Sequence, residues 1–348
     1  MSDARFSRRA ALFVAAGTCA MLSATPSFAY YYEAGDLVVS IEGGNGATDN
    51  QAAPLTLEEL RLNGSSPATV VGTVVLPQTT VTANGVTNYA VSGEYGSSSE
   101  GTLQLSGNGQ YLSIMGYGVN AAAYNANPLS YGGSVAALGQ SASADVPRVA
   151  ALIGTNGSVD STTALTNVFN TNNPRSVYTV DGSSFYVSGQ GVKGDTTQGV
   201  FYAVKGATTA TAIDTSTDTR DVQIVNGKLT VSRDFNGSGG AQATNISTLS
   251  GPGGTLPTSS TGVTTAQILP AGGSTGSITL TTSTANGVNN GRLGTTVYLS
   301  PENFFYASPT VLYVADSGAP KNGNAEKAAL GDGGLQKWVL VNGTWTLE

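Results

Sequence analysis

The sequence predicts an all-β fold, and three observations carry this prediction. Beyond residue 35, no helical spacing of apolar residues persists. Short runs rich in Val, Tyr, Thr, Leu and Ile alternate with turn residues throughout this region. The pair Asn-Gly occurs eleven times, and it suits the two positive φ angles of a type I′ hairpin turn. The chain is therefore expected to be built from antiparallel hairpins.

The composition narrows the class of protein. Of 348 residues, 40 % are hydrophobic, 11 % are charged and 46 are glycine. A disordered chain would carry more charge, a coiled coil would be rich in Glu, Lys and Leu, and collagen needs glycine at every third position. Histidine is absent and cysteine occurs once, which excludes histidine-based catalytic triads and most zinc sites.

Residues 1–29 have the pattern of a signal peptide. A basic start with Arg5, Arg8 and Arg9 precedes an apolar run over residues 10–22, and Ser27-Phe28-Ala29 is a small-x-small cleavage site. The paired arginines resemble the twin-arginine export signal, while ordinary secretion stays open. The apolar run is too short to span a bilayer, so no retained transmembrane helix is expected. The sequence therefore predicts a periplasmic or extracellular protein.

The strands expected after residue 35 fall into repeated units. Alternation and turn signals predict strands, in chain order, at residues 37–41, 101–106, 111–116, 175–180, 185–189, 199–204, 209–213, 220–225, 228–232, 303–306, 311–316, 334–340 and 344–347. The one stretch with helix-like spacing, residues 55–62, fits a strand equally well. Tyr111, Tyr186, Leu229 and Tyr313 hold equivalent positions in successive units.

Repeated four-stranded antiparallel sheets along one chain are typical of a β-propeller. About five units are recognised, so residues 30–348 are expected to form a single β-propeller-like domain, with a two-sheet β-sandwich as the fallback. The uneven spacing of the units predicts Gly/Ser/Thr-rich loop insertions at residues 237–262 and 271–292.

The last unit resembles a known repeat. Residues 312–318, LYVADSG, and residues 335–338, LQKW, resemble adjacent strands of the NHL repeat, a propeller repeat. This chain departs from it by inserting residues 319–334 where the NHL repeat has only a few. More broadly, residues 34–348 resemble secreted bacterial propeller-like proteins without assigned activity. The resemblance implies a propeller fold and names no activity.

Four arginines form the main candidate ligand-binding set. Arg148, Arg175 and Arg220 each precede or begin a predicted first strand, and Arg292 precedes the apolar residues 293–299. First strands of a propeller line its central channel, so these guanidinium groups could converge at one mouth and bind carboxylate, sulfate or phosphate. The alternative is that each arginine pairs with a nearby acid, such as Asp145, Asp218 or Asp221, and fixes neighbouring blades.

A calcium site is the second candidate. Asp234, Asn236 and Ser238 place oxygen donors at alternating positions before Gly239, as in the first half of a calcium loop. Asn245 stands where such a loop needs its final acidic residue. The pattern therefore makes calcium a possible cofactor, with no other cofactor indicated; a turn in which the same side chains bind backbone amides is the alternative.

The net charge of −7 makes nucleic acid an unexpected partner, because binding the phosphate backbone needs basic patches. The sequence favours an exported, non-catalytic binding or cell-surface interaction protein, with a polysaccharide or an envelope protein as partner. The alternative is a carboxylate- or calcium-dependent hydrolase, such as a lactonase or a glycan-cleaving enzyme. That alternative would use a pair among Glu42, Glu58, Glu59, Glu94, Glu100 and Glu302.

Overall fold

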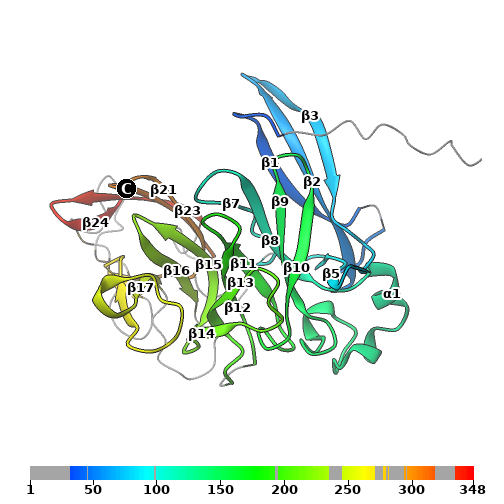
Figure 1. Cartoon of the computed structure of the whole chain (residues 1–348). Helices are drawn as coiled ribbons and strands as arrows, with labels where there is room; N and C mark the ends of the chain where they lie inside the picture. Colours follow the sequence, from blue (N-terminus) through cyan, green and yellow to red (C-terminus); the bar gives the residue numbers. More distant parts are fainter. Residues whose placement is uncertain are drawn as a thin grey trace, which may run out of the picture.

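The protein is an all-β molecule built mainly from four-stranded antiparallel sheets (Figure 1). The computed structural model describes residues 32–44, 46–97, 99–192, 195–234, 245–270, 277–279, 281, 294, 296–317 and 334–348. Within these ranges the only α-helix is α1 (Ala121–Ala126), whose N-cap Asn120 accepts a hydrogen bond from the amide of Ala123. Three short 3-10 helices complete the helical content: η1 (Pro128–Tyr131), η2 (Leu138–Gln140) and η3 (Pro252–Gly254).

The largest sheet has the strand order β1-β2-β6-β8-β9-β10, with β3 paired to β2 and β7 paired to β8. Its members are β1 (Leu37–Glu42), β2 (Ala52–Asn63), β3 (Ser66–Val75), β6 (Ser92–Glu94), β7 (Gln104–Leu105), β8 (Tyr111–Tyr117), β9 (Arg148–Gly154) and β10 (Val159–Leu165). Within it, β7 to β10 pair in chain order and form an antiparallel meander.

Three further meanders follow, each of four strands paired in chain order. They are β11 (Pro174–Tyr178), β12 (Ser184–Gly189), β13 (Gly199–Val204) and β14 (Thr211–Asp214); β15 (Asp218–Val225), β16 (Lys228–Asp234), β17 (Asn245–Ser250) and β18 (Thr264–Gln267); and β21 (Pro301–Ser308), β22 (Val311–Asp316), β23 (Gly334–Val341) and β24 (Thr344–Leu347). Two separate hairpins are β4 (Val81–Ala83) with β5 (Val86–Asn88), and β19 (Ser277–Thr279) with β20 (Thr296–Tyr298).

The repeat predicted from the sequence is present in these sheets. Tyr111, Tyr186, Leu229 and Tyr313 lie on β8, β12, β16 and β22, which are the second strands of the four meanders. Residues 55–62 belong to strand β2 and not to a helix. The prediction of a loop over residues 237–262 was wrong in part, because β17 lies inside it and supplies the third strand of its sheet. Helix α1 was not predicted, since six residues are too few to show a helical period.

Asn-Gly turns connect hairpins as expected. At Asn84-Gly85, Asn226-Gly227 and Asn342-Gly343 both residues have positive φ, from 49° to 52° for asparagine and from 74° to 82° for glycine. These values are those of a type I′ turn, whose twist matches that of the flanking strands. The pairs join β4 to β5, β15 to β16 and β23 to β24.

The meanders pack face to face in chain order, and apolar clusters fill each contact. Met115 and Leu152 of β8 and β9 meet Val187 and Phe201 of β12 and β13. On the other face of that second meander, one cluster joins Tyr186, Val200, Ile213, Val222, Leu229, Val231 and Leu249. Between the last two meanders, Ile246 packs with Phe304, Leu312, Val314 and Trp338. The middle sheets are thus covered on both faces.

Strands β1, β2 and β3 project from the body at the end opposite to β21–β24 (Figure 1). Strand β3 pairs with β2 alone, and Val70, Val71 and Val75 on it are exposed to solvent. Among the described residues, no helix is long and apolar enough to cross a membrane.

Candidate functional site

Two of the four predicted arginines lie on first strands, as the sequence suggested. Arg175 is the second residue of β11 and Arg220 is the third residue of β15. Arg148 begins β9, which is the third strand of its meander, so its predicted position at a first strand was wrong. The sequence hid this pairing because residues 118–147, which include α1, separate β9 from its partner β8. Arg292 lies outside the described residues.

Arg175 and Arg220 each bind an acid on the next sheet. The Arg175 guanidinium pairs with Asp218 of β15 and also donates to the Thr219 carbonyl at 3.2 Å and to Gln190 Oε1 at 2.7 Å. Arg220 pairs with Glu302 of β21. Because both arginines and Asp218 are buried, these ion pairs tie consecutive sheets together inside the protein. For Arg175 this is the pairing with Asp218 that the sequence offered as an alternative; ligand binding by these arginines stays a prediction.

Asp221 connects the first strands of all four meanders. Its carboxylate accepts hydrogen bonds from Gln104 of β7, from the Ser176 hydroxyl of β11 at 2.9 Å and from Gln223 Nε2 at 2.8 Å. Gln223 in turn donates to the Phe304 carbonyl of β21 at 3.0 Å. Burial raises the pKa of Asp221 to about 6, against the lowering effect of these hydrogen bonds. Hydrogen bonds of the Asp221 and Gln223 side chains therefore join the four first strands, and each strand supplies only some of the donors and acceptors.

Arg148 is fully buried and binds main-chain oxygens of two loops. It donates to the carbonyls of Ser141, Val146, Phe169 and Asn172 at 2.8 to 3.2 Å, and to the Ser141 hydroxyl at 3.1 Å. The guanidinium carbon also lies 4.7 Å from the centre of the Tyr117 ring. The planar guanidinium group of Arg148 thus holds residues 141–146 and 169–172 in place relative to β9.

The second of these loops holds unusual backbone angles. Phe169 and Thr171 have φ of 49° and 46°, in the left-handed region that costs a residue with a Cβ roughly 1–2 kcal/mol. Two of the arginine hydrogen bonds go to the Phe169 carbonyl, and the Phe169 ring packs edge-on to Phe201 with 5.6 Å between ring centroids. Strain held by surrounding contacts in this way is frequent at binding sites.

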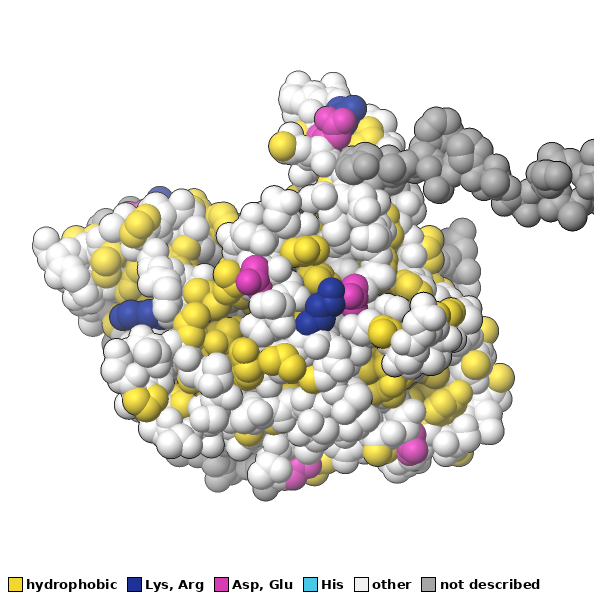
Figure 2. Space-filling view, in the orientation of Figure 1, with side chains coloured by type: hydrophobic (Ala, Val, Ile, Leu, Met, Phe, Trp, Pro, Cys, Tyr) yellow, Lys and Arg dark blue, Asp and Glu magenta, His cyan; other side chains and the backbone are white. Residues whose placement is uncertain are grey.

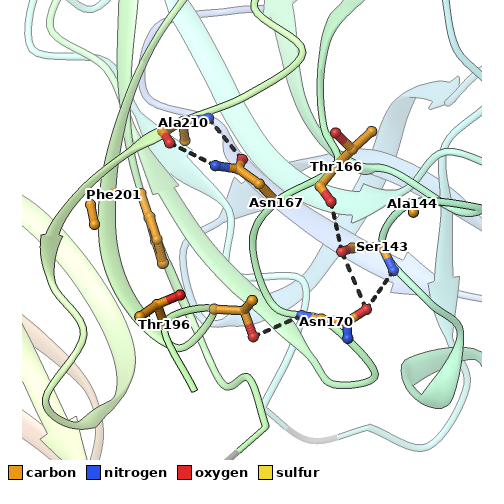
Figure 3. A pocket seen from close by; sticks show the side chains of 10 residues that line it. Ser143, Ala144, Thr166, Asn167, Asn170, Thr196, Phe201 and Ala210 are labelled. Atoms are coloured by element: carbon orange, nitrogen blue, oxygen red, sulfur yellow. Dashed lines mark hydrogen bonds between the residues drawn. The ribbon is translucent and has the colours of Figure 1, made fainter. Parts of the chain in front are cut away.

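The two loops that Arg148 fixes form part of the wall of a surface hollow of about 510 Å³ (Figure 3). We call it the hollow, and it is lined by Ser143, Ala144, Thr166, Asn167, Asn170, Thr196, Thr197, Phe201, Ala210 and Ala212. None of these ten residues is charged. In Figure 3, Thr196 and Phe201 face Asn167 and Asn170 across the opening. The lining therefore combines hydroxyl and amide groups with one aromatic ring.

Hydrogen bonds within the lining hold its shape and leave donors available. Asn167 exchanges two 2.9 Å hydrogen bonds with the backbone of Ala210, and Asn170 Oδ1 accepts from the Ser143 amide at 3.0 Å (Figure 3). The Asn170 Nδ2 group and the Thr196 hydroxyl make no hydrogen bond to any residue that the structure describes. Both groups can donate to a bound ligand.

A smaller hollow of about 310 Å³ lies between β15 and β21, lined by Gln223, Ile224, Val225, Asn226, Phe305, Tyr306, Ser308 and Pro309. On the face shown in Figure 2, charged side chains are few, and some basic groups lie directly beside acidic ones. That face presents no basic cluster to an anionic ligand.

Three of the glutamates considered for hydrolysis lie near one another: Glu42 at the end of β1, Glu94 at the end of β6, and Glu100 in the segment after β6. Burial, together with repulsion from Glu100 and Glu94, raises the pKa of Glu42 to about 8, and burial raises the pKa of Glu100 to about 7. Glu100 accepts hydrogen bonds from Tyr117 and Asn173, and Glu94 accepts one from the Gly139 amide. Glu42 Oε1 is buried and has no hydrogen-bond partner among the residues that the structure describes.

This cluster predicts a stability that falls as the pH rises. Because the pKa values of Glu42 and Glu100 are higher in the folded state, that state binds more protons than the unfolded chain between about pH 4.5 and pH 8. We expect the free energy of unfolding to decrease by roughly 2–4 kcal/mol from pH 5 to pH 8.5. Urea unfolding across this range measures it, and Glu42→Gln should flatten the slope. A stability that rises with pH would contradict this assignment.

The calcium prediction falls largely outside the described residues. Strand β16 ends at Asp234, and Asn236 and Ser238 lie beyond the described part. Within the described ranges, no group of three or more acidic side chains is arranged to hold a metal ion. Asp214 and Asp218, which are near each other in sequence, bind different arginines, Arg233 and Arg175.

Comparison with known proteins identified no relative: no family model, no curated protein and no solved structure matches this chain.

Sequence reasoning missed the residues of the hollow. Asn167, Asn170, Asn172 and Asn173 crowd one short segment, but none of them is among the site residues predicted from the sequence. Four asparagines within seven residues are more than one turn requires, and this local excess is the sequence feature that could have indicated a binding site. Thr196 and Ala144 carry no local signal, because only the packing of three loops brings them together.

Proposed function

We propose that this is an exported, non-catalytic binding protein that recognises a neutral polysaccharide of the cell envelope in the hollow. Residues 1–29 would direct export to the periplasm or beyond. The observation that carries the proposal is the lining of the hollow: it has no charged side chain, and two of its donors, Asn170 Nδ2 and the Thr196 hydroxyl, make no hydrogen bond to a described residue. Sugar hydroxyl groups both donate and accept hydrogen bonds, and their apolar C–H faces suit aromatic and alanine side chains.

The proposed scaffold is a propeller-like arrangement of the four meanders. Its support is the order of their first strands: β7 contacts β11, β11 contacts β15, and β15 contacts β21. Asp221 and Gln223 join these four strands by hydrogen bonds, as expected for innermost strands around one axis. The hollow lies on loops at the side of this arrangement, so the ligand site differs from the channel mouth expected from the arginines.

Removing one donor from the hollow should weaken binding without unfolding the protein. A glycan array followed by calorimetric titration would identify a neutral glycan ligand. Thr196→Val deletes a hydroxyl but keeps the side-chain shape, and we expect it to raise the Kd about 5- to 10-fold, the effect of one lost hydrogen bond. Ala144→Trp should fill the exposed rim and abolish binding.

Thr211→Val is the matched control for Thr196→Val. Thr211 is exposed on β14 but, next to the lining residue Ala212, its side chain points to the other face of the strand. It should leave the Kd unchanged. Binding of acidic glycans only, or equal effects of the two threonine substitutions, would contradict the proposal.

A carboxylate-dependent hydrolase is the second candidate, and one observation favours it: besides burial, repulsion from Glu94 raises the pKa values of both Glu42 and Glu100, so the three carboxyl groups lie near one another. The same glycan panel separates the two functions. If the chain is a hydrolase, incubation near pH 6 releases shorter products and Glu42→Gln stops their release. If it is a binding protein, the bound glycan is recovered intact.

A further inference from the structure

The outer face of the β21–β24 sheet has the character of a buried surface. Phe305, Tyr313, Ala315, Leu335 and Val339 share this face, as the register of β21, β22 and β23 requires. Phe305 is 64 % exposed and Leu335 is 77 % exposed. The opposite face is buried by Phe304, Leu312, Val314 and Trp338. Strand β22 is thus apolar on both faces, a pattern typical of strands that are covered on both sides.

We propose that this outer face binds the same face of a second copy of the chain, forming a two-fold symmetric dimer. The first reason is continuity with the packing inside the molecule. The β11–β14 and β15–β18 sheets are each packed between two neighbours, whereas the described residues pack against only one face of β21–β24. A second β21–β24 sheet would continue the stack through the same kind of contact.

The second reason concerns symmetry. A head-to-tail contact would need the far end of the stack, the outer face of β7–β10, to be free. That face is already covered, because Ile114, Val149 and Ile153 on it pack against Leu55 and Val91. With that face covered, the stack can continue only through a contact between two identical outer faces, and such a contact closes as a dimer.

The third reason is electrostatic. The chain carries a net charge of −7, so most contacts between two copies bring acidic groups together. On the outer face, Lys337 is paired with Glu348 at 2.7 Å within the same sheet, and the other residues of the face are uncharged. Aromatic anchors such as Phe305 and Tyr313 are enriched at protein interfaces.

Sedimentation equilibrium of the exported protein over a range of concentrations tests the dimer. The wild type is expected to dimerise, and Phe305→Glu and Leu335→Glu should each raise the dimer dissociation constant about 100-fold or more, because a carboxylate would be buried at the contact. Both positions are exposed in one copy, so neither variant should lower the Tm of the monomer.

Val70→Glu is the matched control, since Val70 is an exposed valine on the projecting strand β3. It should leave the dimer intact. A wild type that stays monomeric, or a dimer lost with Val70→Glu and retained with Phe305→Glu, would overturn the proposal.

Discussion

Replacing Arg148 by methionine is expected to lower the free energy of unfolding by about 3–5 kcal/mol and to abolish glycan binding in the hollow. Each buried carbonyl left without a donor costs about 1–3 kcal/mol, although such costs do not add fully. Arg148 serves four carbonyls, two of them in the segment that carries the left-handed Phe169 and Thr171. Without the guanidinium, that strained segment should relax and the wall of the hollow should move.

Arg148→Lys separates the role of the positive charge from the role of the several N–H donors of the guanidinium group. Lysine keeps the positive charge but cannot reach carbonyls of two loops at once, so binding should be lost while part of the stability is regained. Chemical unfolding gives the stability, and calorimetry below the Tm of each variant gives the Kd. If Arg148→Lys bound the glycan normally, the loops would not depend on the guanidinium group.

Replacing Asp218 by alanine should destabilise the protein by about 3–5 kcal/mol, because the buried Arg175 would keep its charge and lose its counter-ion. Chemical unfolding measures the change. The double variant Arg175→Met with Asp218→Leu should be more stable than Asp218→Ala, since it leaves no unpaired charge inside. The Kd for the glycan should stay as in the wild type in both proteins.

The surface pair of Lys205 with Asp160 is the control for this comparison. Both side chains are partly exposed and lie away from the proposed dimer face, so Lys205→Ala should lower the stability much less than Asp218→Ala. If Asp218→Ala were equally mild, or if it removed glycan binding without affecting stability, Arg175 would belong to a ligand site and not to the contact between sheets.

The fold was largely predictable because its signals are local. Alternation and Asn-Gly turns placed β12, β13, β16, β22 and β24 within two residues of their observed bounds. Strand β17 was missed because the sequence around it is rich in Gly, Ser and Thr, and its burial depends on packing against neighbouring sheets. The pairing of β9 with β8 was missed because no short turn connects them.

The candidate site was less predictable, because it depends on contacts between distant residues. Arg148 was selected from its position before an apolar run, but its bonds to Phe169 and Asn172 arise from the packing of loops. Likewise, nothing local in the sequence pairs Arg220 with Glu302, which lies 82 residues away. The sequence identifies arginines that could bind a ligand. Whether such an arginine faces solvent or the interior depends on the residues that the fold places beside it.

A crystal structure of the protein with a neutral glycan selected from the array would show where the ligand binds. We expect density for the sugar in the hollow, with hydroxyl groups within hydrogen-bond distance of Thr196 and Asn170 and one sugar face toward Ala210 and Ala212. Arg148, Arg175 and Arg220 should keep the internal partners described above. Density for the ligand beside those arginines, with their ion pairs broken, would contradict this expectation.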